Sequence, residues 1–392
     1  MKNNYDVIVV GGGPSGSMSA IEIAKAGYSV CILEKDRDIG MPVRCGEAIG
    51  YTGLTQFFSP KPEWIASEID GAKLIAPGNI ELNIPFRNET GFILNRRVFD
   101  YDLSKIAVSS GAEVYTKSYV KGLIISDNFV RGVVLNYLDQ EIEINAKIVI
   151  GADGIESRVG RWGNIKTSIR MKDMESCMQY SVANINVKNN QMIMYVGQEY
   201  APGGYLWIFP KGDGFANIGI GISGKYSKNK SAKKYIDEFI SDNYPEVSIL
   251  TTVCGGVPCP KPHKNPINNG LMLVGDAAHQ INPMTGGGIA SGMRGGQIAG
   301  EIAVKALEKG DYSENMLKLY PKKMFKVFGK THERFYRIKE TINQLTDAEL
   351  NHIAKQVSTI PSDKVGLSDV FKSAVYKKPS LIIDVLKVFA GI

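Results

Sequence analysis

Apolar and helical segments alternate at the start of the chain, and they predict a βαβ unit. Residues 5–10 read YDVIVV, a β-branched run typical of a strand that is buried on both faces. A glycine-rich stretch follows at residues 11–16, and a helix is predicted over residues 17–26, where Gly27 ends it. Residues 28–34 form the next predicted strand. Two strands joined in this way are expected to lie parallel in one sheet.

The pattern changes further along the chain. Residues 36–51 are rich in Gly and Pro and predict a loop, residues 98–109 predict a helix, and residues 111–135 predict two or three strands. A buried strand is predicted at 142–150. Strands and turns then alternate over residues 176–224, which is typical of an antiparallel sheet. Another buried strand is expected at 270–275, and the chain after residue 288 is mostly helical.

Three glycines between the first strand and the first helix indicate a dinucleotide site. Gly11 allows the tight turn, Gly13 lets the backbone approach a pyrophosphate, and Gly16 allows close packing of helix on strand. The helix start adds N–H groups that favour phosphate. Glu34 ends the second strand, where a carboxylate would accept hydrogen bonds from ribose hydroxyls. Its charge disfavours a 2′-phosphate, so FAD or NAD is expected here rather than NADP.

Two later motifs favour FAD over NAD. GADGIESR at residues 151–158 and GDAAH at 275–279 both follow buried strands, at the strand ends where open α/β sheets bind ligands. Asp276 would accept a hydrogen bond from a ribityl hydroxyl. The glycine run 286–288 supplies backbone N–H donors at a helix start, suited to a pyrophosphate or to the pyrimidine edge of a flavin. Together the three motifs predict FAD.

The positions of these segments predict an α/β protein with an α+β insert. We expect a Rossmann-like FAD-binding domain, an inserted antiparallel-sheet substrate domain and a helical C-terminal region. A chain of 392 residues is long enough for more than one core. The predicted division places residues 1–70, 95–175 and 265–305 in the FAD-binding domain, 71–94 and 176–264 in the substrate domain, and 306–392 in the helical region.

The order of the motifs resembles the flavoprotein hydroxylase superfamily, which also holds flavin halogenases and geranylgeranyl reductases. Two segments are similar to the archaeal geranylgeranyl reductase family in particular. They are PVRCGE at residues 42–47 and YLWIFP at 205–210, which NIGIG follows at 217–221. Halogenases carry WxWxIP where this chain has YxWxFP, which argues against that branch. The resemblance covers about residues 5 to 305.

The resemblance, together with the glycine motif, implies a set of flavin contacts. Arg96 matches an R-x-x-F-D segment and offers a cation to phosphate or flavin, and Val120 matches a strand position near the adenine. The complete set expected to bind the cofactor is Gly11, Gly13, Ser15, Gly16, Glu34, Cys45, Gly46, Ala48, Arg96, Val120, Asp276, Gly288 and Ile289.

Three aromatic residues alternate in the YLWIFP segment. Tyr205, Trp207 and Phe209 are spaced by two, so their rings project from one face of a strand. An aromatic face is a suitable wall for a long apolar substrate. An ordinary sheet core would show the same alternation.

The family resemblance implies FAD-dependent reduction of isoprenoid C=C bonds in geranylgeranyl chains of archaeal ether phospholipids, a step of membrane lipid biosynthesis. Reduced flavin would supply a hydride, and a second group must supply a proton. The candidates are Cys45, Glu47, His279 and Tyr205. Arg44 would favour the thiolate of Cys45, although we expect this cysteine to contact the flavin rather than to act covalently. A hydroxylase-type monooxygenase acting on an aromatic or lipid substrate, and a non-catalytic FAD protein, remain alternatives.

Composition and charge narrow the expected partners. The substrate would be an isoprenoid lipid or a prenyl diphosphate. No second GxGxxG lies between a strand and a helix, so an external electron donor (NADPH, ferredoxin or deazaflavin) is expected. No nucleic acid is expected as a partner. The net charge of +6 permits an anionic partner. Residues 322–339 carry seven basic side chains with interleaved aromatic rings, and residues 381–392 are apolar; either segment could meet a membrane surface.

Other features set the expected compartment. Five scattered cysteines without a histidine cluster argue against zinc and for a reducing compartment. The first strand begins without a signal peptide before it, and no apolar run is long enough to span a bilayer. The sequence therefore predicts a cytoplasmic protein, with peripheral attachment to the membrane left open, and no metal site.

Overall fold

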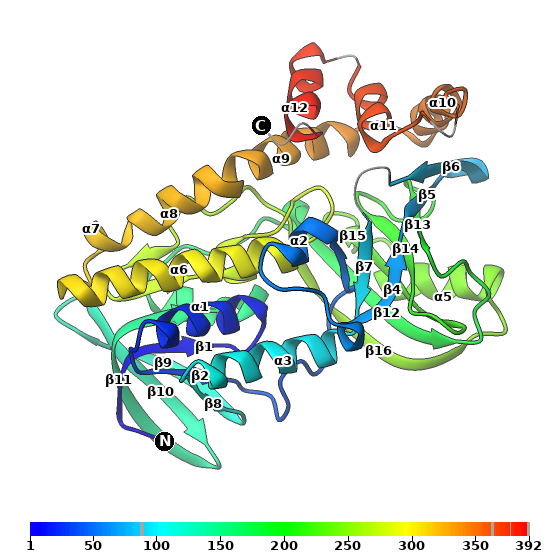
Figure 1. The fold of residues 1–392 in the computed structure, drawn as a ribbon. Coiled ribbons are helices and arrows are strands. Elements are labelled where there is room, and N and C mark those ends of the chain that lie inside the picture. Colours follow the sequence, from blue (N-terminus) through cyan, green and yellow to red (C-terminus); the bar gives the residue numbers. More distant parts are fainter. Residues whose placement is uncertain (87–89, 362–363, 377, 390–392) are drawn as a thin grey trace.

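The computed structural model describes residues 1–86, 90–361, 364–376 and 378–389. Figure 1 shows two regions side by side: a sheet covered by α1, α3 and α6, and a second, mainly antiparallel sheet flanked by α5. A long helical rod, α8 to α9, runs above both regions and ends beside the C-terminal helices. This arrangement is the predicted α/β protein with an antiparallel insert and a helical C-terminal region.

The first sheet contains the predicted βαβ unit. β1 (Asn4–Val10) pairs in parallel with β2 (Val30–Leu33) on one side and with β11 (Gln140–Gly151) on the other. The strand order is β17-β18-β11-β1-β2-β8, and β9 and β10 extend β11 as antiparallel strands. The remaining strands are β8 (Glu113–Tyr115), β9 (Ser118–Ser126), β10 (Phe129–Tyr137), β17 (Ile267–Asn268) and β18 (Leu271–Leu273).

Two helices far apart in the sequence interlock over this sheet. α1 (Pro14–Lys25) packs against α6 (Ile289–Lys309), and α3 (Arg96–Ser109) lies on the other side of α1. The Ser19 hydroxyl donates to the Gly296 carbonyl at 3.0 Å. A Cβ on Gly296 would lie 2.1 Å from the Ser15 carbonyl oxygen, so only glycine allows this approach. The close contact holds the first and last parts of the nucleotide-binding region together.

The second sheet has seven strands in the order β16-β12-β15-β14-β13-β5-β6. One face is an apolar core under α5 (Ala232–Asn243), to which Met178, Ile208 and Ile220 contribute. The opposite face carries the residues at alternate positions, including Tyr205, Trp207 and Phe209. The strands are β5 (Gly71–Ala76), β6 (Ile80–Pro85), β12 (Met174–Ala183), β13 (Gln191–Val196), β14 (Tyr205–Pro210), β15 (Phe215–Ser223) and β16 (Ser248–Pro258).

A third sheet of three strands lies where the two regions meet. β7 (Gly91–Leu94) pairs with β3 (Ala48–Gly50) and with β4 (Ile65–Ile69). The prediction that residues 36–51 are all loop is therefore wrong at its end, because β3 pairs there and the short α2 (Tyr51–Thr55) follows. The small sheet takes strands from both sides of the predicted boundary at residue 70, so that domain division stays a prediction.

The C-terminal region is helical, as expected. α7 (Glu314–Leu317) and α8 (Leu319–Met324) lead through a π-helical turn at Phe325–Gly329 into α9 (Lys330–Ile342). α10 (Asp347–Ser358) begins with a capping box between Thr346 and Glu349, and α11 (Leu367–Ala374) and α12 (Pro379–Phe389) follow. Residues 390–392 of the apolar tail lie outside the described residues.

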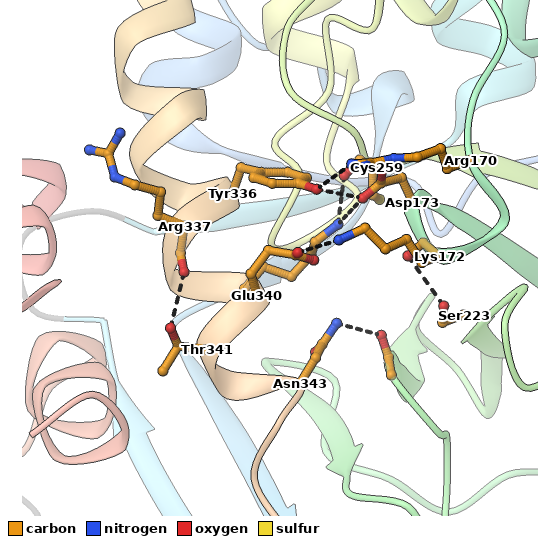
Figure 2. Close-up of polar contacts among 12 residues, drawn as sticks. Arg170, Lys172, Asp173, Ser223, Cys259, Tyr336, Arg337, Glu340, Thr341 and Asn343 are labelled. Carbon is orange, nitrogen blue, oxygen red and sulfur yellow. Dashed lines mark hydrogen bonds and ion pairs between the residues drawn. The ribbon is translucent and has the colours of Figure 1, made fainter. Parts of the chain in front are cut away.

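A buried polar cluster fixes α9 to the start of β12. Asp173 accepts hydrogen bonds from the Tyr336 hydroxyl at 2.8 Å and from Arg170 Nε at 3.0 Å, and Lys339 Nζ lies 3.7 Å from its carboxylate. Figure 2 shows these side chains converging between α9 and the loop before β12, with Lys172 paired to Glu340 beside them. The cluster anchors the helical region to the second sheet.

The segment 322–339 does not present an aromatic surface. Tyr336 is buried, Phe328 packs against the core of the first region, and Arg334 and Lys339 are buried as well. Lys322, Lys326 and Lys330 remain exposed. Phe325 and Phe335 are half-buried. The rings do not form one exposed face, and contact of this segment with a membrane surface stays a prediction. No helix in the described part of the chain is both long and apolar enough to cross a bilayer.

Candidate active site

The turn after β1 has the shape that the glycine motif predicts. Gly11 has φ +110°, and a Cβ there would lie 2.3 Å from the Ala152 carbonyl oxygen. A Cβ on Gly16 would lie 2.0 Å from the Gly11 oxygen, so helix and strand touch at this point. Nothing lies within 4 Å of the equivalent position on Gly13. The backbone at Gly13 is thus open to a ligand, and no side chain caps the N-terminus of α1 beside it.

Acidic and basic side chains surround this opening. Glu34 accepts hydrogen bonds from the N–H groups of Gly12 at 2.8 Å and Asp36 at 2.9 Å. Arg96, at the first turn of α3, forms a two-pronged ion pair with Asp100 at 2.6 and 2.7 Å. A cavity of about 140 Å³ lies between these groups and the loop that precedes Cys45.

Asp276 lies in the 3-10 helix Gly275–Ala278, shortly after β18. Burial raises the pKa of Asp276 to about 6, and the positive charge of Arg96 opposes that rise. Arg96 therefore acts electrostatically on Asp276 within the site. The loop continues through Thr285 to Gly288, which is the N-cap of α6, and Ile289 is the first residue of that helix.

Ser15 and Val120 occupy the expected margins of this space. Ser15 lies in the first turn of α1, and a Cβ on Gly275 would lie 2.6 Å from its hydroxyl. It therefore borders the loop that carries Asp276. Val120 is buried in β9, whose first residue Ser118 donates its N–H to the Glu34 carbonyl at 2.8 Å. This contact puts β9 next to the strand end where the ribose is expected.

The loop at Cys45 to Glu47 joins the two regions. Glu47 has φ +71° and is buried. Its carboxylate accepts hydrogen bonds from the Arg96 backbone N–H at 2.9 Å, Lys211 Nζ at 2.6 Å and Asn217 Nδ2 at 2.6 Å. Because three donors hold its carboxylate in place, Glu47 orients the loop and α3. The contacts argue against a role for Glu47 as the proton donor.

The structure corrects the prediction that Arg44 favours a thiolate at Cys45. Burial raises the pKa of the Cys45 thiol, and the cation that opposes the rise is Arg96 rather than Arg44. The Cys45 sulfur accepts a hydrogen bond from the Glu47 N–H at 3.2 Å. Ala48 follows in β3 and packs with the aromatic cluster of the second sheet.

The aromatic face of β14 meets this loop. Tyr205 and Trp207 have ring centroids 5.7 Å apart, and Trp207 and Phe209 have centroids 6.1 Å apart. A Cβ on Gly46 would lie 2.9 Å from the Phe209 ring, and one on Gly219 would lie 2.2 Å from the Trp207 ring. The glycines of both family segments are thus required by the aromatic rings they contact.

Tyr205 and His279 use their polar atoms within the protein. The Tyr205 hydroxyl donates to the Thr285 carbonyl at 2.5 Å, and burial raises the pKa of that hydroxyl well above its usual range. His279 Nε2 lies 3.3 Å from the Thr167 carbonyl, and its ring is 5.4 Å from that of His263. Burial lowers the pKa of His279 to about 4, so its ring is neutral at pH 7. Both groups are therefore poor proton donors.

Three residues that the motifs did not identify join the site. Gln179 Nε2 donates to the Cys45 carbonyl at 3.0 Å, and its Oε1 accepts from the Trp207 indole at 3.3 Å. Lys211 and Asn217 hold Glu47, as described above. Asn217 begins the family segment NIGIG, two positions before Gly219, which was a signal in the sequence, whereas Gln179 lies on a strand without a motif.

These residues fit FAD. The open backbone at Gly13, the uncapped start of α1 and Glu34 suit an adenosine diphosphate, and the half-buried Arg96 and Asp276 offer a cation and an acceptor to the rest of the cofactor. Gly13, Arg96 and Arg44 line one cavity, so the cofactor path leads from the turn after β1 toward the loop that carries Cys45. The described part of the chain contains no cluster of three or more potential metal-ligating side chains.

Comparison with known proteins identifies the family. Residues 6–53 match the FAD dependent oxidoreductase family, and residues 173–257 match the geranylgeranyl reductase catalytic domain. The chain is 40% identical over 389 residues to a digeranylgeranylglycerophospholipid reductase of Methanocella arvoryzae, covering 98% of this chain and 99% of that protein. The chain belongs to the geranylgeranyl reductase family. It is an FAD-dependent oxidoreductase.

Further similarities agree with membership of the geranylgeranyl reductase family. The chain is 41% identical to digeranylgeranylglycerophospholipid reductase 1 of Methanococcoides burtonii, over 96% of this chain and 93% of that one. A crystal structure of a geranylgeranyl bacteriochlorophyll reductase-like protein from Thermoplasma acidophilum superposes with a TM-score of 0.91 at 35% identity, covering 98% and 99% of the two chains. A flavin-dependent brominase, 17% identical with a TM-score of 0.72 over 99% and 100% of the two chains, shares the fold alone.

Proposed function

We propose that this geranylgeranyl reductase saturates the C=C bonds of geranylgeranyl chains in a digeranylgeranylglycerophospholipid. The observation that carries the proposal is the aromatic face of Tyr205, Trp207 and Phe209, packed directly against the Cys45–Gly46 loop beside the cofactor path. Relatives that share this chain's full length carry the corresponding name. An apolar wall beside a flavin site suits an isoprenoid chain rather than a small polar substrate.

The chain's own residues supply binding and orientation. Bound FAD in its reduced form provides the hydride. Arg96 and the open backbone at Gly13 bind the cofactor, Glu47 holds the loop that carries Cys45, and Gln179 fixes that loop to Trp207. The aromatic face excludes water from the double bond and aligns it. Because the sequence has one dinucleotide motif, we propose that a separate donor (NADPH, a ferredoxin or a deazaflavin) reduces the flavin.

The experiment that tests the proposal is an anaerobic half-reaction. The purified holoenzyme is reduced with dithionite, an unsaturated geranylgeranyl ether phospholipid is added, and flavin absorbance and lipid mass are followed. We expect flavin reoxidation together with a gain of hydrogen atoms in pairs. Oxygen-dependent formation of a hydroxylated product from another compound, with no change in the lipid, would replace the reductase by a monooxygenase.

We also propose that the enzyme attaches peripherally to the membrane that holds its substrate, through α12. Ile383, Leu386 and Phe389 are 53%, 49% and 40% exposed, and their spacing of three puts them on one side of the helix. Lys387 is exposed on the same helix. Apolar side chains beside a cation suit the interface of an anionic bilayer.

Vesicle sedimentation tests this attachment. The double variant I383E/L386E should bind vesicles containing phosphatidylglycerol about tenfold more weakly than the wild type, since each glutamate replaces apolar contact with like-charge repulsion. V108E is the matched control, because Val108 is 52% exposed on α3, away from this helix. Equal binding of all three proteins would exclude α12 as the contact.

A further inference from the structure

Glu175 is a buried acid without a partner, at the start of β12. The residue is 8% exposed, and its Oε2 has no hydrogen-bond partner among the described residues. Losing water without gaining a partner costs free energy, so buried carboxyl oxygens normally accept hydrogen bonds. A carboxyl that is left unsatisfied is typical of a functional group rather than a structural one.

The sheet beside Glu175 has little side-chain cover. Cys177, two positions along β12, pairs with Gly221 of β15, and Gly221 pairs in turn with Tyr205 of β14. A Cβ on Gly221 would lie 3.3 Å from the Cys177 sulfur, and one on Gly204 would lie 3.2 Å from Glu175 Oε2. The two glycines thus keep bare backbone next to the carboxyl. This leaves the carboxyl on the same face of the sheet as the aromatic rings.

Electrostatic contacts connect Glu175 with the cofactor side of the site. Burial raises the pKa values of Tyr205, Cys177 and Cys259, and the ionised form of Glu175 adds to each rise, as Asp276 does for Cys259. Tyr205 reaches the glycine-rich loop before α6 through its hydrogen bond to Thr285. The side chains of Cys177 and Tyr205 keep some solvent-accessible surface, yet desolvation is the main cause of their raised pKa values. This combination is typical of residues that line an internal space.

The charged groups around Glu175 leave it neutral. Burial raises its pKa to about 8; Lys339 of α9 opposes the rise and Asp173 adds to it. Lys339 cannot neutralise Glu175 by a direct ion pair, because its ammonium donates to the Cys259 carbonyl at 2.6 Å and lies 3.7 Å from Asp173. The thiols of Cys177 and Cys259 and the hydroxyl of Tyr205 carry no charge at neutral pH. The carboxyl therefore keeps its proton at pH 7.

The other acids near the cofactor are engaged or unsuited. Glu47 is an acceptor for three donors, the Tyr205 hydroxyl donates a hydrogen bond to the Thr285 carbonyl, and His279 is neutral. Cys45 is protonated, but burial makes its thiol a weaker acid still. Of these acids, and within the described part of the chain, Glu175 combines a proton, an oxygen without a hydrogen-bond partner and a position on the aromatic face.

We propose that Glu175 is the catalytic proton donor of the reduction, an assignment that rests on the proposed function. One alkene carbon receives the hydride and its electron pair from reduced flavin. As the π bond breaks, the other carbon forms a C–H bond with the proton of Glu175, whose O–H bond breaks. The product gains two hydrogens and two electrons, and Glu175 remains as a carboxylate until water returns the proton.

The test compares E175Q with E340Q in the anaerobic half-reaction. Glu340 lies in the same interface and is half-buried, but it points from α9 toward Lys172, with which it forms an ion pair, and so its carboxylate has a partner (Figure 2). We expect E175Q to lose about 100-fold or more in the rate of lipid reduction, the usual contribution of general acid catalysis. E340Q should stay within about twofold of the wild type, E175D should regain part of the rate, and FAD content and reduction by dithionite should be unchanged in all variants.

Two measurements on the wild type keep the proposal testable if E175Q does not fold. The single-turnover rate should fall as the pH rises above about 8, where Glu175 ionises. Infrared difference spectra should show a protonated carboxyl band that disappears over the same pH range. Wild-type activity with no such band, or an E175Q variant with the wild-type rate and pH profile, would overturn the role of Glu175 alone. A wild type that never reduces the lipid would overturn the proposed function itself.

Discussion

Asp173 and Glu175 are two residues apart and both are buried, but their surroundings differ. Asp173 receives hydrogen bonds from Arg170 and Tyr336 and lies close to Lys339, so its charge is balanced where α9 docks (Figure 2). Glu175 lies beside the bare glycines Gly204 and Gly221, and its Oε2 has no partner among the described residues.

The difference shows that the environment, not the residue type, decides what a buried carboxyl does. A carboxylate with several donors fixes two elements together, and losing it leaves uncompensated charge. A carboxyl without donors is kept neutral by burial and can act as a general acid. The sheet thus uses one acid for assembly and, as we propose, the next acid for chemistry.

The largest expected effect is at the assembly site. D173N should lower the free energy of unfolding by about 3 kcal/mol, because Lys339 is left buried without a counter-charge. Urea unfolding of the two proteins at pH 7 measures this difference. The control E238Q breaks the surface ion pair between Lys230 and Glu238 and should cost at most about 1 kcal/mol. Equal losses in D173N and E238Q would contradict the role of Asp173 in fixing α9 to the second sheet.

The next effect concerns Glu175 and depends on pH. Its folded-state pKa of about 8 lies above the ordinary value of 4.5, so the native state binds a proton more tightly than the unfolded state. Stability is therefore lost as the pH rises from 4.5 through about 8. E175Q does not ionise, so between pH 6 and pH 9 it should gain about 2 kcal/mol relative to the wild type. Parallel stability curves for the two proteins over that range would mean that Glu175 does not titrate there.

The smallest effect should come from removing one donor of Asp173. Y336F deletes the hydroxyl that donates to Asp173 and accepts from Arg170 Nη2, which should cost about 1 kcal/mol because the other donors remain. In the double variant D173N/Y336F the loss in free energy of unfolding should be smaller than the sum of the two single losses, since both residues belong to one network. Y101F, at an exposed tyrosine on α3, should leave the unfolding midpoint unchanged.

The sequence predicted the parts of the site that are built from backbone. Gly11 and Gly16 are required by contacts shorter than any side chain allows, so the motif determines the turn wherever it occurs. The aromatic alternation at residues 205–209 was predicted for the same reason, because a strand fixes the direction of every second side chain.

The sequence could not predict contacts that depend on the assembly of distant elements. Asp173 and Tyr336 are 163 positions apart in the sequence, and no local pattern predicts their hydrogen bond. The effect of Arg96 on Cys45 depends on how α3 meets the loop, which is why the neighbouring Arg44 seemed the natural cation. The sequence does show Glu175 as an acid at an inward position of the strand MESCMQYSVA. Its protonation state, however, follows from its burial, which only the folded structure shows.

The interlock of α1 with α6 sets the order in which the chain can fold. Ser19 and Gly296 are separated by 277 positions, and the whole antiparallel sheet is synthesised between them. Contacts of such long range form late, because the intervening chain must be present and ordered before they can close. During synthesis, α1 can therefore pack against α6 only after nearly three hundred residues have left the ribosome. The insert can pair its own strands first, and the pocket for the nucleotide is completed last.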